Sequence, residues 1–480
     1  MGSLSAPAVI STRIPARLDR LPWSPFHWRV VAALGITWVL DGLEVTFMGA
    51  VSGVLETPQA LGLSAEQIGL LGSAYLAGAV LGALLFGRLT DRHGRKRLFF
   101  VTLAVYLAGV ALSAFAWDLA SFLAFRFLTG CGIGGEYAAV NSAIDELIPA
   151  RHRGRVGLAI NGSFWLGAAL GSGATALLLD PALFAPDLGW RLGFGLGATI
   201  GLAILLLRRA LPESPRWLLT HGRAEEAERV LEGIEREIAT RSGRALAPSE
   251  APPLTVRPRG ATGLAEVART MFARYRQRTL LCAALMTSQA FLYNAIFFTY
   301  ALVLTRFYAV PASDTGLYLL PFSIGNFLGP LLLGPLFDRV GRRAMISLTY
   351  ATSGMLLAAT GALFAHGMLS AAGQTGLWSL IFFFASAAAS SAYLSASELF
   401  PLEIRALAIA VFFVIGTGAG GVAAPWLFGL LIGTGSVNAL FWGYLAGAAL
   451  MLLAAVAVLA WGVRAEQRPL EDVAPPLSLV

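Results

Sequence analysis

Long apolar stretches recur along this chain, and they constrain its fold more than any other feature. A helix needs about 20 mostly apolar residues to cross a hydrocarbon core of about 30 Å. The 480 residues contain twelve such stretches, at approximately 29–54, 67–88, 97–116, 118–144, 155–180, 189–209, 277–304, 315–337, 344–365, 376–399, 405–431 and 437–463. Only 13% of the residues are charged, whereas soluble domains carry about 25%. The sequence therefore predicts an all-α membrane protein with 12 transmembrane helices.

A polar segment between the sixth and seventh stretches divides the chain into two halves. Its EEAERVLEGIEREIA run combines helical spacing with dense charge, which predicts a solvated amphipathic helix. The final EQRPLEDVAPPLSLV run is rich in proline and polar residues, which predicts disorder. We expect a cytoplasmic N-terminal segment at 1–28, a six-helix bundle at 29–210, a cytoplasmic central loop with amphipathic helices at 211–275, a second bundle at 276–464 and a disordered cytoplasmic tail at 465–480.

Positive charges gather on one side of the predicted membrane. They are Arg88, Arg92, Arg95, Lys96, Arg97, Arg151, Arg153, Arg155, Arg339, Arg342, Arg343, Arg405 and Arg464, whereas the opposite loops hold Arg191 and Arg306. Because cytoplasmic loops are enriched in Lys and Arg, we expect both termini in the cytoplasm of a bacterium and the protein in its inner membrane. The formal net charge of +7 is then an insertion signal, and no nucleic-acid partner is expected.

Residues that carry enzymatic chemistry are sparse in this sequence. Cys131 and Cys282 lie in apolar runs, the five histidines are scattered, and neither a zinc spacing nor a disulfide framework is present. The sequence also has no Ser/His/Asp grouping and no P-loop. We therefore expect no enzyme, no catalytic residue, no cofactor and no metal.

An internal repeat follows the second and eighth stretches. GRLTDRHGRKR at 87–97 and GPLFDRVGRR at 334–343 share the pattern G-x-x-x-D-R-x-G-R-[KR], and each follows the second helix of a six-helix half. Two parallel halves around a site near the bilayer midplane are a transporter architecture. The repeat therefore predicts two pseudo-symmetric six-helix bundles with a solute site between them.

With this repeat, the chain resembles the major facilitator superfamily over nearly its whole length. Other motifs resemble its sugar-porter and metabolite:proton symporter branches, namely PESPRWLLTHGRAEEA (212–227), RFLTGCGIGGEY (126–137), ELFPLEIR (398–405) and DGLE (41–44). The resemblance implies a secondary active transporter that moves a small polar organic solute, a sugar or an organic acid or other metabolite, by alternating access. It also implies coupling to protons by symport, with the solute, protons and the lipid bilayer as partners of a monomer.

Two rival interpretations remain open at this point. One is a proton-coupled exporter of drugs or metabolites in the same fold, because the sequence does not fix the direction of transport. The other is a non-transporting membrane sensor, although the central loop and the tail are too short for an output domain.

Three ionisable residues lie within predicted spans, where each needs a partner or a function. Asp41 and Glu44 share a helix face because they are three residues apart. At ~1.5 Å per residue, Asp41 lies ~18 Å, Glu44 ~22 Å and Arg126 ~18 Å from the inner edge. The resemblance places Glu44 where proton-coupled sugar porters carry an acid, and Arg126 where they carry its partner. A carboxyl whose distance from the arginine changes during transport would bind and release a proton. The alternative to this proton-coupling role is a static ion pair between the acid and Arg126 that does not titrate.

Charged residues also mark the predicted cytoplasmic ends of the spans. The repeated loops contribute Asp91, Arg92, Arg95, Asp338, Arg339 and Arg342, and the ends of the fourth and tenth spans contribute Glu146 with Arg153 and Glu398 with Arg405. The resemblance implies a charge network that closes this side of the transporter. Since partly exposed ion pairs contribute about 0–1 kcal/mol each, several of them could bias the conformational equilibrium without freezing it. The arginines could instead serve only as topology signals.

Candidate solute contacts are polar and aromatic groups within the predicted spans. They are Asn161, Trp165, Gln289, Tyr293, Asn294, Asn326 and Tyr393. The resemblance implies that Gln289 and Asn294 match a Gln…Asn pair of sugar porters and that Asn161 replaces a Gln. Ser288 and Leu292 depart from that pattern, and Tyr393 replaces a Trp. These departures argue against a hexose, and the Asp-Gly-x-acid pattern of the first span resembles symporters of organic acids and related metabolites. The seven residues themselves could serve either solute class.

The glycines of RFLTGCGIGGEY satisfy G-x-G-x-x-G, the pattern of a dinucleotide-binding turn. Such a turn leaves a strand and opens a helix, whereas these glycines lie within one apolar run. Gly130 and Gly134 are four residues apart, which favours close packing of helices instead.

Overall fold

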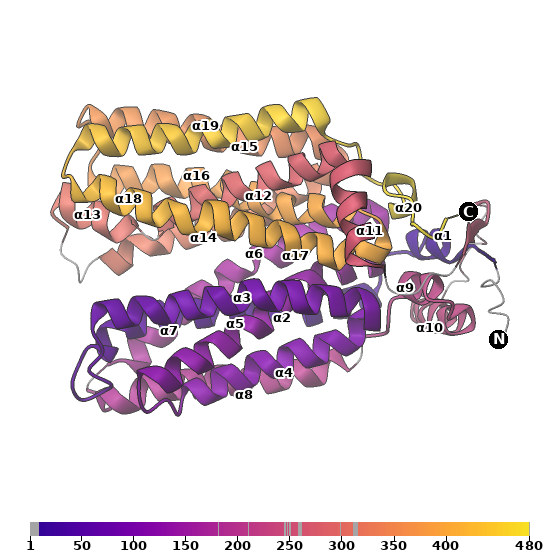
Figure 1. Cartoon of the computed structure of the whole chain (residues 1–480), viewed down its shortest axis with the longest axis horizontal. Helices are drawn as coiled ribbons and strands as arrows, with labels where there is room; N and C mark the ends of the chain where they lie inside the picture. The colour runs from indigo at the N-terminus through magenta and orange to yellow at the C-terminus, as the bar shows by residue number, and fades with distance from the viewer. Residues whose placement is uncertain are drawn as a thin grey trace.

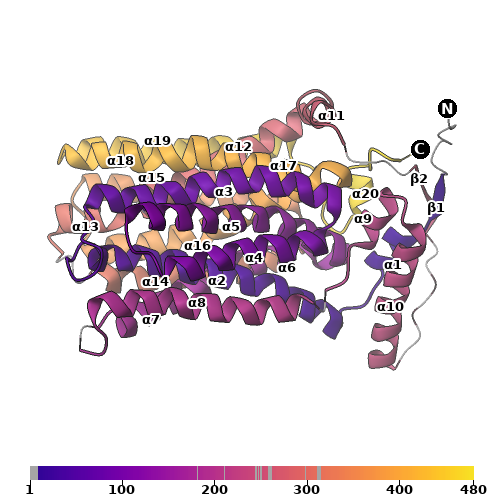
Figure 2. The same ribbon diagram turned by 60° about the horizontal axis from the view of Figure 1, so that its bottom comes forward.

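The computed structural model describes residues 9–180, 182–209, 211–243, 246, 248, 251–257, 262–297, 299–310 and 315–479. Residues 1–8 of the expected N-terminal segment lie outside the described residues. Two groups of long helices lie side by side and roughly parallel to one another (Figure 1). The short helices of the chain ends and of the central loop lie at one end of these groups, together with both termini and the strands (Figures 1 and 2). We call this end the terminal end.

The first group is built from residues 25–208. It contains α2 (Pro25–Leu55), α3 (Ala65–His93), α4 (Arg95–Ser113), α5 (Leu119–Leu147), α6 (Arg153–Gly162), α7 (Phe164–Leu178) and α8 (Pro186–Arg208). The second group contains α12 (Arg276–Phe297), α13 (Tyr300–Tyr308), α14 (Thr315–Arg339), α15 (Arg342–Ala365), α16 (Ala371–Glu398), α17 (Arg405–Ile415), α18 (Ala423–Gly433) and α19 (Val437–Trp461). The order matches the twelve predicted spans.

Local sequence signals explain where several helices begin. Ser64 caps α3 and Asp118 caps α5, since each side chain accepts a hydrogen bond from the backbone N–H three residues later. Gly94 separates α3 from α4 with a φ of 97°, and Gly341 separates α14 from α15 with a φ of 112°. Residues with side chains rarely adopt these angles, so the glycines of the repeated motif permit its tight turns.

Three of the predicted spans are interrupted. Ser163 separates α6 from α7, and its hydroxyl donates a hydrogen bond to the carbonyl of Ile160 at 2.6 Å. The seventh span is divided into α12 and α13. In the eleventh, the glycine-rich segment Gly416–Val422 forms a π-helix between α17 and α18. Within the described residues, ten helical segments are long and apolar enough to cross a membrane.

The predicted packing role of the glycines in the fourth span is confirmed. A Cβ atom added at Gly130 would collide with the backbone carbonyl of Tyr75, and one at Gly134 with that of Ala79. The backbones of α3 and α5 therefore approach each other closely. This contact leaves no space for a nucleotide phosphate.

Short elements of the central loop and of both chain ends pack together at the terminal end. They are β1 (Ile10–Thr12), α1 (Ile14–Asp19), α9 (Pro215–Thr220), α10 (Ala224–Ser242), β2 (Leu254–Val256), α11 (Leu264–Arg269), a π-helix (Thr270–Arg274), α20 (Leu470–Val473) and two 3₁₀-helices (Ala150–His152 and Leu402–Ile404). The amphipathic helix expected in the central loop is α10, which buries Ala227, Leu231, Ile234 and Ile238 on one face.

The prediction of a disordered tail is wrong for the described residues. The tail forms α20 and then reaches β2, where Leu479 bridges to Val256, and β2 pairs in turn with β1. Leu470 and Val473 are buried, and Glu403 accepts hydrogen bonds from the backbone of the tail. A few apolar anchors and a buried acid order this segment despite its proline-rich composition.

Candidate transport site and closing network

An ion pair joins α2 and α5 in the interior of the first helix group. The guanidinium of Arg126 donates to Oε1 of Glu44, and both side chains are at most 3% exposed. Oε2 of Glu44 is buried without a hydrogen-bond partner. The guanidinium carbon of Arg126 also lies 4.7 Å from the ring centre of Tyr75. The pair predicted from depth alone is thus formed, with one carboxylate oxygen left free.

Asp41 has different partners from Glu44, although both acids belong to α2. Its carboxylate accepts hydrogen bonds from the hydroxyl of Tyr75 at 2.9 Å and from that of Tyr137 at 2.6 Å. The side chain is fully buried and forms no ion pair with Arg126. Two tyrosine hydroxyls, and not the guanidinium of Arg126, are therefore the partners of Asp41.

An aromatic cluster connects the two helix groups beside Asp41. Trp38 stacks on Tyr137 with ring centres 4.7 Å apart, and the ring centre of Tyr393 lies 6.1 Å from that of Trp38. Phe413 of α17 contacts Tyr137 from the second group. Tyr393 was predicted, but Trp38 and Tyr137 were missed. An aromatic residue in an apolar run carries no functional signal, although Tyr137 is the last residue of the RFLTGCGIGGEY motif.

A second central cluster contains three of the predicted solute contacts. Trp165 of α7 stacks on Tyr293 of α12 with ring centres 6.0 Å apart. The hydroxyl of Tyr293 donates to Oδ1 of Asn326 at 2.6 Å. Phe322 and Phe382 pack against these rings. The residues come from both halves, so this cluster also lies at their interface.

The other predicted contacts are dispersed. Asn161 donates to Asn141 at 3.2 Å and to the carbonyl of Gly157, both within the first half. Asn294 donates to the carbonyl of Ala290 in its own helix, and Gln289 lies 3.9 Å from the sulfur of Met286. These three amides are therefore engaged locally and do not join either aromatic cluster.

A second intramembrane ion pair was missed from the sequence. Glu136 of α5 and Arg208 at the end of α8 are at most 1% exposed and 2.6 Å apart. Arg208 also donates to the carbonyl of Phe99 and to Thr37, while Thr102 donates to Glu136. The pair therefore ties α2, α4, α5 and α8 together. The sequence did not single out Arg208 as an ion-pair partner, because an arginine at the end of an apolar stretch is also expected as a signal for membrane orientation.

In each repeated motif, one aspartate accepts hydrogen bonds from the first turn of a helix in the opposite half. Asp91 accepts from the backbone N–H groups of Ala406 and Leu407, in the first turn of α17, at 3.2 and 3.0 Å. Asp338 accepts from those of Gly154 and Arg155, in the first turn of α6, at 3.0 and 2.8 Å. A carboxylate at a helix N-terminus is favoured by its free N–H groups and its dipole. These contacts hold the two halves together at the terminal end.

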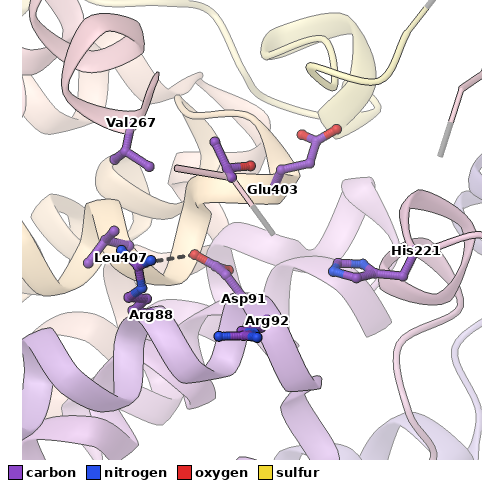
Figure 3. Close-up of a pocket in the computed structure, with 8 residues that line it drawn as sticks. Arg88, Asp91, Arg92, His221, Val267, Glu403 and Leu407 are labelled. Atoms are coloured by element: carbon purple, nitrogen blue, oxygen red, sulfur yellow. Dashed lines mark hydrogen bonds between the residues drawn. The ribbon is translucent and has the colours of Figure 1, made fainter. Parts of the chain in front are cut away.

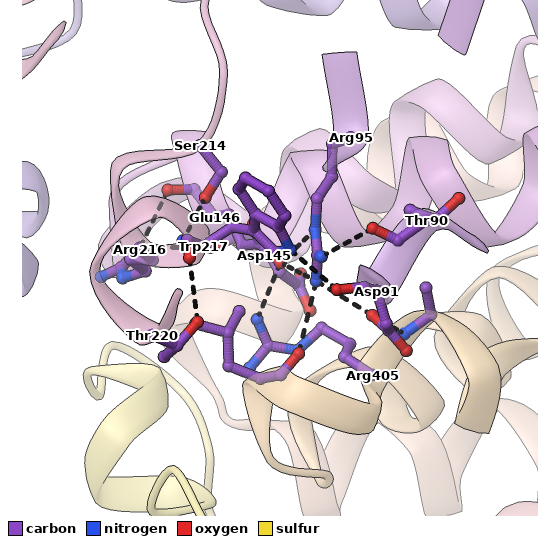
Figure 4. A network of polar contacts seen from close by, with 12 residues as sticks. Thr90, Asp91, Arg95, Asp145, Glu146, Ser214, Arg216, Trp217, Thr220 and Arg405 are labelled. Atoms are coloured by element: carbon purple, nitrogen blue, oxygen red, sulfur yellow. Dashed lines mark hydrogen bonds and ion pairs between the residues drawn. The ribbon is translucent and has the colours of Figure 1, made fainter. Parts of the chain in front are cut away.

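The acids that end the fourth and tenth spans pair with different arginines from those that the sequence predicted. Glu146 pairs with Arg95 at 2.8 Å and with Arg405 of the opposite half at 3.5 Å (Figure 4). Glu398 pairs with Arg342 at 2.9 Å and with Arg153 of the opposite half at 3.7 Å. The expected pairs, Glu146 with Arg153 and Glu398 with Arg405, are wrong because the closed ends of the halves interlock.

Burial of this network also differs from the expectation of partly exposed pairs. The side chains that form it are at most 9% exposed. Removal of one partner from a buried pair leaves an uncompensated charge and costs about 3–5 kcal/mol. Arg92 and Arg339, which were also predicted here, are exposed and form no ion pair with a described residue.

A second repeated contact was missed because its motif is degenerate. The backbone N–H of Arg95 donates to Glu213 at 3.0 Å, and that of Arg342 donates to Glu466 at 3.2 Å. Glu213 belongs to LPESP, after the sixth span, and Glu466 belongs to RAEQRP, after the twelfth. A glutamate shortly after the last span of each half was therefore the only shared feature that could have predicted this contact. Burial raises the pKa of Glu213, and the backbone N–H groups oppose this rise.

Comparison with known proteins agrees with this architecture. The family described as "Sugar (and other) transporter" matches residues 29–475. The chain belongs to this family. A solved structure of the proton:xylose symporter XylE, of the major facilitator superfamily, has a TM-score of 0.75 at 18% identity and covers 94% of this chain and 98% of its own. The fold is therefore that of the major facilitator superfamily, with 12 transmembrane helices in two bundles.

Relatives within the sugar transporter family carry metabolites of different kinds. The niacin transporter NiaP of Acinetobacter baylyi is 27% identical over 412 residues, which cover 85% of this chain and 88% of NiaP. The 4-hydroxybenzoate transporter PcaK of Pseudomonas aeruginosa is 35% identical over 230 residues, 47% of this chain and 49% of PcaK. This protein is therefore an integral membrane transporter of the sugar or metabolite type.

Proposed function

We propose that this transporter moves a small carboxylated organic metabolite together with a proton, by alternating access. The observation that carries the proposal is the Glu44–Arg126 pair, in which one carboxylate oxygen is buried without a partner. Burial favours the protonated form of a carboxyl, whereas a nearby guanidinium favours the charged form. A change in their separation during transport would therefore make Glu44 bind and release a proton. Arginine suits this role because it stays charged throughout.

The second acid supports the same mechanism. Asp41 lies one helical turn from Glu44 and is held by the hydroxyls of Tyr75 and Tyr137. Tyr137 also belongs to the aromatic cluster between the halves, so movement of this cluster alters the hydrogen bonds of Asp41. This connection provides a physical route by which a solute at the cluster affects the protonation of the acids.

The aromatic clusters favour a flat solute over a hexose. Trp38, Tyr137 and Tyr393 form one apolar surface at the interface, and Trp165 with Tyr293 forms another. Niacin and 4-hydroxybenzoate, which the relatives NiaP and PcaK are named for, are both aromatic rings with one carboxylate. Release of Arg126 from a protonated Glu44 would provide a cation for such a group.

The closing network gives the proposal a direction. We place the terminal end in the cytoplasm, because most loop arginines lie there, and the cell inner membrane of a bacterium as the location. The network then closes the cytoplasmic side, so solute would enter this state from outside. We propose inward symport on this basis, whereas export in the same fold would require the opposite coupling.

The test is uptake by the purified protein in proteoliposomes. Radiolabelled niacin, 4-hydroxybenzoate and xylose are offered with and without an imposed pH gradient, acidic outside. We expect accumulation of an aromatic carboxylate that collapses when the gradient is dissipated by a protonophore. Transport of xylose alone would overturn the solute class. Transport of any solute without dependence on the pH gradient would overturn proton coupling.

A further inference from the structure

A small crevice opens at the terminal end where α3 meets the second helix group. Arg88 and Arg92 of α3, His221 after α9, Val267 of α11, and Glu403 and Leu407 beside the start of α17 line it (Figure 3). It lies on the seam between the two halves, because α3 belongs to the first and α17 to the second. Apart from Asp91 and its backbone donor Leu407, its lining residues take no part in the proton site or the closing network.

The two arginines of this crevice lack partners. Neither Arg88 nor Arg92 forms an ion pair with a described residue, and one terminal nitrogen of Arg88 is buried without a hydrogen-bond partner. They are four residues apart, so they lie on one face of α3. A buried guanidinium N–H without an acceptor is rare in proteins, and it indicates an acceptor outside the part of the chain that the structure describes.

The acids that also line the crevice do not neutralise these arginines. Asp91 accepts from the backbone of Ala406 and Leu407 and pairs with Arg95. Glu403 accepts from the backbone of the tail at 2.9 and 3.0 Å. Both carboxylates are therefore directed at other groups. The remaining positive charge suits a phosphate, which two guanidinium groups recognise well.

The surface above the crevice indicates that this phosphate belongs to a lipid. Leu85 and Leu81 lie one and two turns before Arg88 on the same face of α3, and each is 52% exposed. On the other side, Leu264 of α11 and Phe272 of the following π-helix are 58% and 57% exposed. A membrane-spanning face that ends in two cations complements an acyl chain and an anionic headgroup. A soluble phosphate would make no use of the leucines.

We propose that the crevice binds the headgroup of an anionic phospholipid, with Arg88 and Arg92 holding its phosphate and one acyl chain lying along Leu81 and Leu85. The headgroup touches both halves at the closed terminal end. Bound lipid therefore stabilises this closed state relative to the state in which α3 and α17 separate. The second repeat carries Pro335 at the position of Arg88, so its crevice lacks the arginine pair and only the first repeat holds the lipid.

The experiment compares phosphatidylglycerol with phosphatidylcholine of the same acyl chains, added to the purified full-length protein in detergent. Lipid retained by the protein is measured by native mass spectrometry, and the unfolding temperature by a thermal shift assay. We expect several-fold more phosphatidylglycerol than phosphatidylcholine on the protein, and a higher unfolding temperature with it. The double variant Arg88→Gln/Arg92→Gln should lose both effects. The matched control Arg339→Gln, at the position of Arg92 in the second repeat, should keep them.

Two measurements keep the proposal testable if the double variant folds poorly. On the unaltered protein, ~0.5 M salt should abolish the preference for phosphatidylglycerol, since screening weakens exposed charge pairs. Inorganic phosphate at millimolar concentration should neither stabilise the protein nor displace the lipid. Equal retention of the two lipids, or equal loss in the Arg339→Gln control, would overturn the site. Stabilisation by phosphate alone would overturn the lipid as its ligand.

Discussion

Glu44 has only half of its carboxylate satisfied, unlike Asp41 and Glu136, which are also buried in the first half. Asp41 uses both oxygens with tyrosine hydroxyls, and Glu136 uses both with Arg208. Glu44 uses one oxygen with Arg126. An acid with a free oxygen in a buried site can accept a proton without breaking an existing hydrogen bond. We therefore propose Glu44 as the acid that carries the transported proton.

The variant Glu44→Gln tests this assignment. It removes the titratable group and keeps its shape, so it should abolish accumulation of solute driven by a pH gradient. Exchange of labelled for unlabelled solute needs no net proton movement and should persist. Both rates are measured in the same proteoliposomes, with Glu266→Gln, an exposed acid of α11, as the control. Accumulation by Glu44→Gln against a solute gradient would refute a proton-carrying role.

Arg208 has a structural role that can be separated from transport. Substitution by Met removes the guanidinium and leaves Glu136 buried without a counter-charge, which should destabilise the protein by about 3–5 kcal/mol. The double variant Arg208→Met/Glu136→Gln leaves no buried charge, so it should recover most of that loss. The unfolding midpoint of each purified variant measures this. If the double variant were as unstable as Arg208→Met alone, the ion pair would not explain the effect.

At the scale of elements, α10 is attached to α1 through charged side chains. Arg17 and Arg20 both contact Glu235 at 2.6 Å. Burial opposes the charged form of Glu235, but hydrogen bonds from these arginines outweigh it and hold its pKa below the ordinary value. A depressed carboxyl pKa contributes stability above the pKa of the unfolded state, and this contribution disappears as the pH falls through the folded pKa.

Acidification should therefore weaken the attachment of α10 before the membrane helices unfold. Since Glu235 is partly exposed, at 16%, the contribution is modest, about 1 kcal/mol or less. The protection of residues 224–242 from hydrogen–deuterium exchange, corrected for the pH dependence of the intrinsic exchange rate, should decrease as the pH falls below the ordinary glutamate pKa of about 4.3. In Glu235→Gln the same segment should exchange faster near neutral pH and change less on acidification. Exchange that is equally pH-dependent in both proteins would contradict the attachment.

At the scale of the whole molecule, the sequence was sufficient for the spans and for the repeat. Apolar length and the two D-R-x-G-R loops locate every long helix because each signal is local. The partners of Glu146 and Glu398 could not be predicted in this way. They depend on how one half packs on the other, and Arg405 and Arg153 reach across the interface only in the closed state. The tail was misjudged for the same reason, because its order comes from distant contacts.

The tail joins both halves at the closed end. Glu471 pairs with Arg216 at 2.9 Å, and Arg216 pairs with Asp19 at 2.8 Å. Gln467 donates to the backbone carbonyl of Asp338, and Arg153 to that of Arg468. The N-terminal segment, the central loop and the tail are thus connected through a single arginine and a small sheet. The contacts of the tail with Arg216 and Arg153 connect it to the first half and the central loop, so we expect them to break when the terminal end opens.

Deletion of residues 465–480 should therefore favour the open terminal end. The deletion removes Glu471, which pairs with Arg216, and the backbone N–H groups that donate to Glu403. The ion pairs of Glu146 and Glu398 remain. A cysteine placed at Ser397, which is 1% exposed, reports opening in a background without Cys131 and Cys282. An impermeant maleimide should label it several-fold faster after the deletion, and Glu471→Gln should give a smaller increase. Because the network of the helices themselves survives, labelling equal to that of the full chain would mean that the network alone closes the transporter.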